Sequence, residues 1–598
     1  MPYRLHLMVC AGTGCVSNHS LELRNALAAE IAKQGLDKEV EIVTTGCNGF
    51  CGVGPIMLVL PDGIFYQQVG VKDVPLFVQE HLLKGRPVKK LMFTPPQVQE
   101  PVPKMCDIPF FGKQMLIALR NRGMIDPENI EESIARGGYQ SLARVLTSMT
   151  PSQVIEEIKA SGLRGRGGGG FPTGIKWETC VKAHSPDGVR YLVCNADEGD
   201  PGAFMDRSII EGDPHSVIEG MIIGAFAIGA HQGYIYVRHE YPLALRRFII
   251  ALEQAREYGL LGKDILGTGF DFDIEIHRGA GAFVCGESTA LMASIEGRPG
   301  EPRAKYVHTV EVGLHNKPTV LNNVETWANV PVIIERGAKW FASIGTEHSK
   351  GTKVFSLAGC VNNTGLVEVP MGITLRELIF DIGGGIADNG KFKAVQTGGP
   401  SGGFIPESLL ELPVDYEKLY EAGSMMGSGG IVVMDEASCM VDVARYFVDF
   451  LTTESCGKCV PCREGLKATL DILTRICDGR GTEEDLATLE ELSTTIVEAS
   501  LCALGGSAPN PVLTSLRYFR DEYQVHIRDR KCPAAVCRAL ITFTIDPVKC
   551  TGCHLCVKAC PTEAALGEPK QPHRIVQEKC IKCGVCYDVC KFDAVIRK

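Results

Sequence analysis

The sequence predicts a multidomain protein that combines α/β and α+β domains, and three observations support this prediction. The chain has 598 residues, which is enough for several domains of ordinary size. Apolar residues make up 45% of it, so it can bury sizeable cores. Its cysteines, 25 in all, gather mostly in short groups near the two ends, with a long glycine-rich region between them. Segments of such different chemistry are typical of separate domains.

The charge and hydropathy of the chain exclude some classes of function. The net charge is −10, which disfavours a general nucleic-acid-binding role. The first ten residues are too short an apolar run for a signal sequence. The longest apolar run, near residues 221–230, is well short of the ~20 residues that a membrane-spanning helix needs. We therefore expect a cytoplasmic protein without direct membrane insertion, in a compartment that keeps thiols reduced.

Residues 1–92 predict a small α/β domain. Apolar patterns indicate strands at 3–9, 40–44, 56–60 and 65–69 and a helix at 21–34. Two cysteine pairs, Cys10 with Cys15 and Cys47 with Cys51, lie in glycine-containing turns that let backbone N–H groups approach the sulfurs. Four thiolates on two loops suit one [2Fe–2S] cluster; a redox dithiol and a zinc site are the alternatives. The spacing resembles that of thioredoxin-like [2Fe–2S] ferredoxins. Four prolines within 94–103 predict a linker over 93–112.

The densest glycine run, from Gly165 to Gly174, predicts a loop that binds a phosphate and admits a flat ring. Gly165 and Gly167 flank Arg166, and Phe171 and Lys176 follow. Arg166 and Lys176 add positive charge. The run does not follow an obvious strand, as a Rossmann fingerprint should, and a flexible loop is the alternative.

Other segments of the same region offer polar side chains for a ligand. They are Asn195, Asp197, Glu198 and Asp200 after a buried strand at 191–194, Gly286 and Glu287 in a glycine-rich turn, and the adjacent carboxamides Asn322 and Asn323.

Twelve cysteines in the last third of the chain have [4Fe–4S] spacing. One group has three cysteines at C-x2-C-x2-C spacing before a predicted helix and a fourth forty residues on: Cys456, Cys459, Cys462 and Cys502. The tail, 541–598, holds two C-x2-C-x2-C-x3-C runs, which are Cys550, Cys553, Cys556 and Cys560, then Cys580, Cys583, Cys586 and Cys590. In two-cluster ferredoxins the fourth cysteine of each run ligates the other cluster. Zinc and disulfides are the alternatives.

Residues 531–540 predict a connector that could bind zinc. Cys532 and Cys537 have C-x4-C spacing, and His526 precedes them. No fourth ligand is evident; His554 and Cys477 are candidates. The alternative is two incidental thiols. The remaining cysteines, Cys439 and Cys477 among them, are interpreted as small buried apolar residues.

The four polar and glycine-rich segments, followed by the cysteines at 456–502, resemble the NADH-oxidising flavin subunit of respiratory complex I. The resemblance implies a non-Rossmann FMN and NAD(H) domain at 113–340, a ubiquitin-like module at 341–430 and a helical [4Fe–4S] domain at 431–530. It implies that FMN is lined by Gly165, Arg166, Gly167, Lys176, Asn195, Asp197, Gly286, Glu287, Asn322 and Asn323, with Glu198 in the same site. Phe171, Lys176 and Asp200 would face the nicotinamide nucleotide. Asp200 stands where the family usually has Glu, so the choice between NAD(H) and NADP(H) stays open.

Over nearly the whole chain, the fused arrangement resembles the flavin (beta) subunit of soluble multimeric [FeFe]-hydrogenases, including electron-bifurcating ones. This implies hydride exchange between NAD(P)H and FMN, with one [2Fe–2S] and three [4Fe–4S] clusters as a relay. The implied partners are a hydrogenase catalytic subunit, a small [2Fe–2S] subunit and ferredoxin, in a hetero-oligomer. Two alternatives stay open: the equivalent subunit of an NAD(P)-dependent formate dehydrogenase, and a relay subunit with a non-catalytic flavin site.

Overall fold

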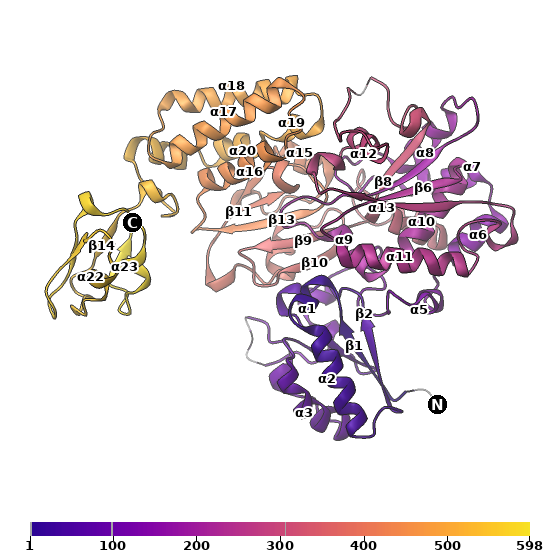
Figure 1. The fold of residues 1–598 in the computed structure, drawn as a ribbon, viewed down its shortest axis with the longest axis horizontal. Helices are drawn as coiled ribbons and strands as arrows, with labels where there is room; N and C mark the ends of the chain where they lie inside the picture. Colours follow the sequence, from indigo (N-terminus) through magenta and orange to yellow (C-terminus); the bar gives the residue numbers. More distant parts are fainter. Residues whose placement is uncertain (1–2, 97, 99, 305) are drawn as a thin grey trace. The chain divides into compact units, whose positions relative to one another are not determined.

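A computed structural model describes residues 3–96, 98, 100–304 and 306–598 (Figure 1). The chain forms two compact units. The first contains the residues up to 389 with 395–402 and 407–433, and the second contains 390–394, 403–406 and 434–598. Within the described residues, no helix is long and apolar enough to cross a membrane.

The N-terminal part of the first unit is a four-stranded sheet with strand order β2-β1-β3-β4. β1 runs parallel to β2 and antiparallel to β3. Leu23, Leu27 and Ile31 lie on one face of α2 and pack into the sheet's core. The elements are β1 (Leu5–Cys10), α1 (Thr13–Ser17), α2 (Ser20–Lys33), β2 (Val40–Thr45), β3 (Met57–Leu60), β4 (Ile64–Tyr66), α3 (Val74–Phe77) and α4 (Pro109–Gly112).

The centre of the first unit is a parallel four-stranded sheet with strand order β7-β6-β5-β8. Its strands are β5 (Tyr191–Ala196), β6 (Gln232–Arg238), β7 (Asp273–Gly279) and β8 (Thr319–Asn323). The helices of this part are α5 (Ile130–Ala135), α6 (Gln140–Ser148), α7 (Pro151–Ser161), α8 (Thr173–Lys182), α9 (Met205–Gly212), α10 (Pro214–Ile228), α11 (Pro242–Glu257), α12 (Ser288–Ile295) and α13 (Val324–Arg336).

Two glycines bring α10 and α13 close together in the core of this domain. A Cβ atom at Gly220 would lie 2.1 Å from the carbonyl oxygen of Trp327, and one at Gly224 would lie 2.6 Å from its ring. Nearly every residue of α10 is buried, so its sequence is an apolar run rather than an amphipathic pattern. The close contact holds α13 against the sheet, and α13 begins directly after β8, where Asn322 and Asn323 lie.

The division between the two units runs through the next module. β9 pairs with β10 in antiparallel fashion, and its residues Ser356 to Gly359 pair in parallel with β13. The module contains α14 (Ala338–Ala342), β9 (Thr352–Gly359), β10 (Gly365–Pro370), β11 (Phe392–Thr397), β12 (Phe404–Pro406), α15 (Tyr416–Glu421) and β13 (Gly430–Asp435).

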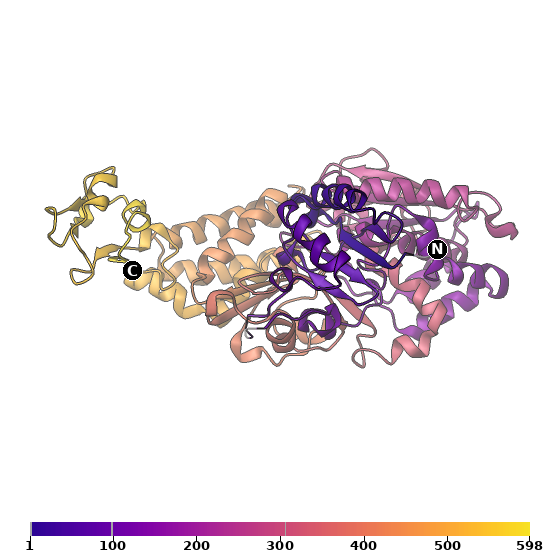
Figure 2. The ribbon, with the colours of Figure 1, turned by 90° about the horizontal axis from the view of Figure 1, so that it is seen from below.

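The second unit is mostly helical. α17 packs against both α16 and α18, and Figures 1 and 2 show these helices lying alongside one another in orange. Leu473, Ile476, Leu489 and Val512 contribute to its core. The helices are α16 (Met440–Glu454), α17 (Val460–Cys477), α18 (Glu483–Ala499), α19 (Ala503–Ser507), α20 (Asn510–Tyr518) and α21 (Arg520–Gln524).

The tail of the second unit is built from two similar halves. β14 pairs with β17, and β15 pairs with β16, in both cases antiparallel. One short helix, α22 or α23, belongs to each cysteine run. The elements are β14 (Phe543–Ile545), α22 (Leu555–Ala559), β15 (Ala565–Leu566), β16 (Arg574–Ile575), α23 (Val585–Asp588) and β17 (Val595–Arg597).

Candidate functional site

The carboxyl edge of the parallel sheet gathers the predicted carboxamides. Asn195 lies near the end of β5 and Asn323 ends β8, and the two are paired in the strand register. Asn195 Nδ2 donates to the carbonyl oxygen of Gly286 over 2.9 Å. This bond ties the glycine-rich turn after β7 to the same edge. Three segments that are far apart in the sequence therefore meet where ligands bind in open α/β sheets.

Lys176 joins the glycine-rich loop to this edge. The loop ends at α8, and Lys176 in the first turn donates through Nζ to Leu321 O over 2.9 Å and to Asn322 Oδ1 over 3.1 Å. At Gly167, an added Cβ would lie 3.0 Å from Asn323 Cβ. The loop thus lies directly against β8, and its glycines permit this approach.

The orientation of the carboxamides suits a ligand that accepts hydrogen bonds. Asn322 is buried, and its Nδ2 is a donor without a hydrogen-bond partner among the described residues. Such a buried donor costs free energy unless a ligand satisfies it. Asn323, in contrast, is used by the fold: its Oδ1 accepts from Glu325 N at the start of α13, and its Nδ2 donates to Asp206.

The acidic residues after β5 have different surroundings. Glu198 is buried and accepts from the backbone of Asp206 and Arg207 at the start of α9, over 3.0 and 3.2 Å. Asp197 lies 3.5 Å from Arg238. Asp200 accepts from Ser428 Oγ over 2.6 Å, and burial raises the pKa of its carboxyl to about 6. Asp200 therefore changes charge near neutral pH.

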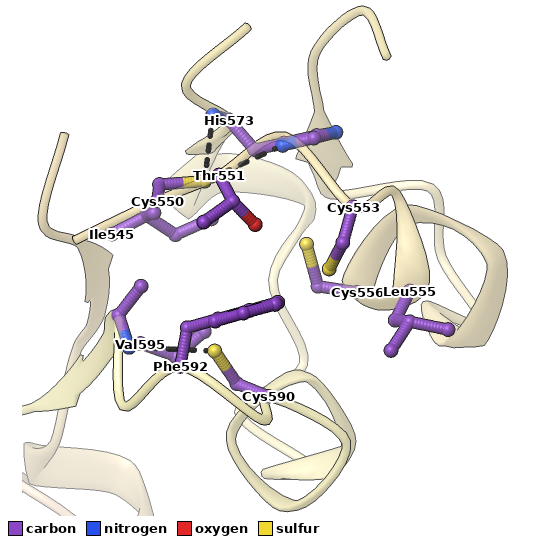
Figure 3. A pocket seen from close by; sticks show the side chains of 11 residues that line it. Ile545, Cys550, Thr551, Cys553, Leu555, Cys556, His573, Cys590, Phe592 and Val595 are labelled. Carbon is purple, nitrogen blue, oxygen red and sulfur yellow. Dashed lines mark hydrogen bonds between the residues drawn. The ribbon is translucent and has the colours of Figure 1, made fainter. Parts of the chain in front are cut away.

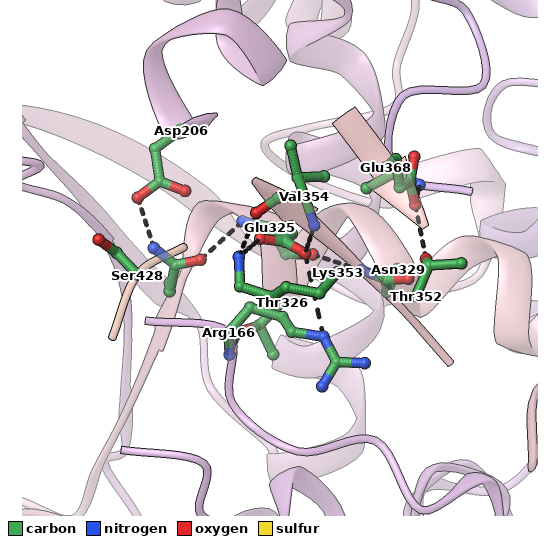
Figure 4. Close-up of polar contacts among 12 residues, drawn as sticks. Arg166, Asp206, Glu325, Thr326, Asn329, Thr352, Lys353, Val354, Glu368 and Ser428 are labelled. Carbon is green, nitrogen blue, oxygen red and sulfur yellow. Dashed lines mark hydrogen bonds and ion pairs between the residues drawn. The ribbon is translucent and has the colours of Figure 1, made fainter. Parts of the chain in front are cut away.

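Two predicted site residues, Glu287 and Arg166, form hydrogen bonds to other parts of the protein through their charged groups. Glu287 accepts from Thr289 N and Ala290 N and so caps α12. The Arg166 side chain is fully buried; it donates to Lys350 O over 2.7 Å and lies 4.0 Å from Glu325 (Figure 4). The positive charge expected on the loop from Arg166 is thus directed into the interior, because main-chain carbonyls and Glu325 attract it there.

Glu325, which lies near Arg166 of the glycine-rich loop, forms a buried ion pair with Lys353. They are 1% and 0% exposed, and Lys353 Nζ donates to both Glu325 and Val354 O (Figure 4). Val354 N donates to the other carboxylate oxygen of Glu325 over 2.9 Å. The pair connects the start of α13 with β9. Phe171, on the loop itself, is 52% exposed and available to a ligand.

The four N-terminal cysteines are brought together by two turns. Cys10 ends β1, Cys15 lies in α1, and Cys47 and Cys51 follow β2. An added Cβ at Gly12 would lie 2.8 Å from Cys47 Cβ, so the turn must be glycine. Hydrogen bonding with Cys51 lowers the pKa of the Cys47 thiol below its ordinary value. The chemistry of four close thiols, with a backbone N–H of Asn48 3.3 Å from Cys10 Sγ, fits an iron–sulfur cluster.

The cysteines of the helical domain also converge. Cys459 is the N-cap of α17, Cys462 lies in its first turn, and Cys502 is the N-cap of α19. Burial is the main cause that raises the pKa of the Cys462 thiol to about 11, and the charges of Cys459, Cys502 and Cys456 act in the same direction. Two helix N-termini at the group favour an anionic centre.

The tail forms two small pockets, each lined by four cysteines. Cys550, Cys553 and Cys556 share the first with Cys590 (Figure 3). Cys580, Cys583 and Cys586 share the second with Cys560. The fourth cysteine of each run thus crosses to the other pocket, as the ferredoxin pattern predicts.

The residues at the junction between the helical domain and the tail, called the junction group here, include a fourth side chain that could ligate a metal and that the sequence did not reveal. Ligand atoms of Cys439, His526, Cys532 and Cys537 lie within 4.8 Å of one another, and all four residues are buried. His526 Nε2 lies 3.4 Å from Cys439 Sγ and 3.3 Å from Cys537 Sγ. Its Nδ1 lies 2.7 Å from Glu522 O and donates there, which leaves Nε2 free of its proton to ligate a metal.

Two expectations about this group need correction. Cys439, interpreted as an isolated buried thiol, is the residue that completes it. His554, a candidate fourth ligand, instead lies 3.0 Å from His573 in the tail. Cys477 belongs to a neighbouring group with Asp442 and Cys537.

Three protein families match successive parts of the chain. The Nuo51 FMN-binding domain matches residues 158–332, and the NADH-ubiquinone oxidoreductase-F iron-sulfur binding region matches 442–526. The 4Fe-4S dicluster domain matches 542–591. These matches confirm the predicted fold class.

Relatives of known function cover most of the chain. It is 58% identical, over 81% of its length and 98% of the relative, to the HndC subunit of the NADP-reducing hydrogenase of Solidesulfovibrio fructosivorans. It is 48% identical, over 70% of its length and 99% of the relative, to the F 2 subunit of the NADH-quinone oxidoreductase of Rhizobium meliloti. An NAD+-reducing [NiFe]-hydrogenase structure in the H2-reduced state covers 88% of this chain and 85% of its own, with a TM-score of 0.62 at 29% identity.

The chain therefore belongs to the family of NADH dehydrogenase-type oxidoreductase subunits that carry FMN and iron–sulfur clusters. Within that family it is similar both to the F-type subunits of NADH-quinone oxidoreductase and to the hydrogenase protein HndC. The resemblance inferred from the sequence motifs is confirmed.

Proposed function

We propose that this chain exchanges hydride between a nicotinamide nucleotide and FMN and passes the electrons through its cysteine-bound clusters to a separate hydrogenase subunit. The observation that carries the proposal is the meeting of Asn195, Asn322 and Lys176 with the glycine-rich loop at one edge of the sheet. The unpartnered Nδ2 of Asn322 supports a ligand there.

The residues of this edge would bind and orient rather than react. FMN, when bound, accepts hydride and releases electrons singly. Glycines of the loop would let its backbone N–H groups reach the FMN phosphate, and Lys176 would add the positive charge. Phe171 and Asp200 would contact the nucleotide, with the Asp200 carboxyl near the ribose.

The cysteines would hold one [2Fe–2S] and three [4Fe–4S] clusters, which amounts to about 14 irons per chain at four thiolates per cluster. The convergence of each group supports this. Iron analysis of the anaerobically purified chain tests it: a content near eight contradicts the assignment of at least one group. Cys47→Ser should remove only the [2Fe–2S] electron paramagnetic resonance (EPR) signal.

The junction group would bind one zinc ion through Cys439, His526, Cys532 and Cys537. Three thiolates and one imidazole are a structural zinc donor set, and burial of all four ligands suits a closed site. Such a site would order the connector between the helical domain and the tail.

The hydrogenase assignment rests on the relative HndC, which belongs to an NADP-reducing hydrogenase. A hydrogenase catalytic subunit, a small [2Fe–2S] subunit and ferredoxin would be the partners in a hetero-oligomer, and the chain would take part in flavin-dependent electron bifurcation. The equivalent subunit of a formate dehydrogenase is the second candidate, and the chains that copurify would distinguish the two.

Anaerobic reconstitution of the full chain with FMN tests the enzymatic role. We expect flavin absorbance and reduction of an artificial dye by NADH or NADPH. A chain that binds FMN but does not reduce the dye is a relay subunit with a non-catalytic flavin, and a chain that binds no FMN contradicts the proposal altogether.

A further inference from the structure

The two halves of the tail repeat each other with an offset of thirty residues. Each of the four cysteines of the first run has its counterpart thirty positions later, as Cys550 has in Cys580. The strand pairs repeat in the same way, because Ile545 pairs with Val595 and Ile575 pairs with Ala565. Every residue of one half can thus be compared with a structurally matched residue of the other.

This comparison shows which side chains differ between the two pockets. In the second pocket, Thr562 Oγ1 lies 3.8 Å from Cys560 Sγ, and the matched residue of the first pocket is Phe592. The difference with the shorter contact to a ligand sulfur is at His573. His573 lines the pocket of Cys550, and Phe543 takes the matched position in the pocket of Cys580. Both side chains are buried, at 4% and 2% exposure. The partner of His573 is His554, and the residue matched to His554 is Gly584. The first pocket is therefore lined by an imidazole that contacts a second imidazole, where the second pocket is lined by a phenyl ring and a glycine.

His573 contacts the ligand sulfur of Cys550 twice. Its backbone N lies 3.4 Å from Cys550 Sγ and its Nδ1 lies 3.5 Å from the same atom (Figure 3). The other ring nitrogen, Nε2, lies 3.0 Å from His554 Nδ1. A cluster-bound thiolate has no proton to donate, so only a proton on His573 Nδ1 makes the contact favourable. His573 Nε2 then accepts from His554 Nδ1, and the two histidines form a consistent chain of donors.

Backbone N–H groups also donate to the cysteines of both halves, although not all from matched positions. Cys580 accepts from Lys582 N over 3.4 Å, and Cys550 accepts from His573 N over 3.4 Å. The crossing cysteines Cys560 and Cys590 accept from Ala564 N and Ala594 N over 3.1 and 3.4 Å. The imidazole donor at Cys550 has no imidazole counterpart at Cys580, since the matched residue is phenylalanine.

We propose that His573, oriented by His554, is a positioning residue that raises the reduction potential of the cluster held by Cys550, Cys553, Cys556 and Cys590 above that of its neighbour. Reduction adds one negative charge to a cluster, and a hydrogen-bond donor at a ligand sulfur stabilises that charge. An electron shared between the two clusters would then lie preferentially on the one held by Cys550, Cys553, Cys556 and Cys590, and the proton would stay on His573. The inference rests on the two clusters of the tail and not on the flavin reaction.

A redox titration of the full chain, followed by the EPR signals of the reduced tail clusters, tests the proposal. His573→Phe gives the first pocket the side chain of the second. We expect the reduction equilibrium of one cluster to fall about tenfold, or about 59 mV for a one-electron step, so that the two midpoints approach each other. Thr551→Ile is the matched control, because it gives the same pocket the residue found at Ile581 without removing a donor to sulfur.

Two further variants distinguish tuning from a structural role. Phe543→His should raise the lower midpoint, and His573→Gln, which retains an N–H donor, should restore part of the separation. Unchanged midpoints in His573→Phe, within a factor of two in the equilibrium, overturn the proposal. If His573→Phe loses iron, Phe543→His alone tests the proposal. The proposal is then overturned if the lower of the two midpoint potentials is the same in Phe543→His as in the unchanged protein.

Discussion

The residues around the proposed flavin site, called the flavin region here, differ from the junction group in the partners of their polar side chains. Around the flavin region, charged side chains have protein partners: Lys353 has Glu325, Lys176 has Asn322, and Glu287 has the start of α12. At the junction, three thiols and one imidazole face one another within 4.8 Å. The first arrangement is complete without its cofactor apart from single donors such as Asn322 Nδ2. The second suits a cation, because three cysteines and one histidine are a structural zinc donor set, and we propose that zinc binds there.

The largest effect should therefore come from the junction. We expect one zinc per chain, and we expect Cys439→Ala to lose it and to lower the unfolding temperature of the second unit. Structural zinc sites contribute ~10 kcal/mol or more in small domains, which exceeds any single contact in the flavin region. Metal analysis and calorimetry measure both effects. Cys106→Ala, at an exposed cysteine, is the control and should change neither.

Zinc retained after Cys439→Ala or Cys532→Ser would place the ligands elsewhere. Zinc well below one per chain with full iron would remove the contrast between the two regions.

The next effect tests the claim that the flavin region balances its own charges. Lys353→Met should lower the free energy of unfolding by about 3–5 kcal/mol, because the buried Glu325 carboxylate loses its closest cation. Replacing both residues, with Glu325→Leu as well, should recover only part of the loss, because the buried Arg166 then loses its carboxylate. The exposed pair Arg376 and Glu411 is the control, and Arg376→Met should cost at most ~1 kcal/mol. Denaturant unfolding gives these values; a loss below ~1 kcal/mol for Lys353→Met would contradict the internal balance.

A third effect concerns the ligand rather than the fold. Lys176→Gln should weaken FMN binding about tenfold or more, because hydrogen bonds to charged groups contribute ~1.5–3 kcal/mol. Unfolding should change much less than in Lys353→Met, since the acceptors of Lys176 on β8 are a carbonyl and a carboxamide and no buried carboxylate is left behind there. Fluorescence titration of the flavin-free protein measures the affinity. Lys182→Gln, in the last turn of the same helix, should bind FMN normally.

The comparison also shows which parts of the site can be predicted from sequence. Most of the proposed cluster cysteines follow from spacing, because thiols three or four residues apart on one turn converge locally, whereas Cys502 lies forty residues beyond its group. Cys439 could not be found in this way, because it lies 87 residues before His526 and only the packing of α16 brings it near. A search for any buried cysteine at a helix N-terminus would have included it.

The direction in which a side chain points was the second property that could not be predicted from the sequence. Arg166 lies in the predicted loop, but the carbonyl of Lys350 and the carboxylate of Glu325 draw its guanidinium inward, and both belong to segments over 150 residues away. The acceptor role of Glu287 at the start of α12 is local, but the sequence did not indicate it, because Glu is not among the residues preferred as N-caps. Spacing thus predicts which segments meet, and tertiary contacts decide which atoms face the ligand.

The smallest effect is a pH dependence at Asp200. Burial raises the pKa of this carboxyl to about 6, so it is neutral at pH 5 and ionised at pH 7. An ionised carboxylate accepts a hydrogen bond from a ribose hydroxyl and repels a ribose phosphate. The KM for NADH should therefore fall, and preference for NADH over NADPH should rise, as the pH increases through about 6. A contribution of ~1 kcal/mol corresponds to about fivefold. Asp200→Asn should flatten the profile. Asp187→Asn is the matched control, because Lys317 holds the pKa of that exposed carboxyl at about 2, outside the window. If the KM for NADH still depends on pH in the same way in Asp200→Asn, another group titrates. The charge of Asp200 then does not determine the preference between NADH and NADPH.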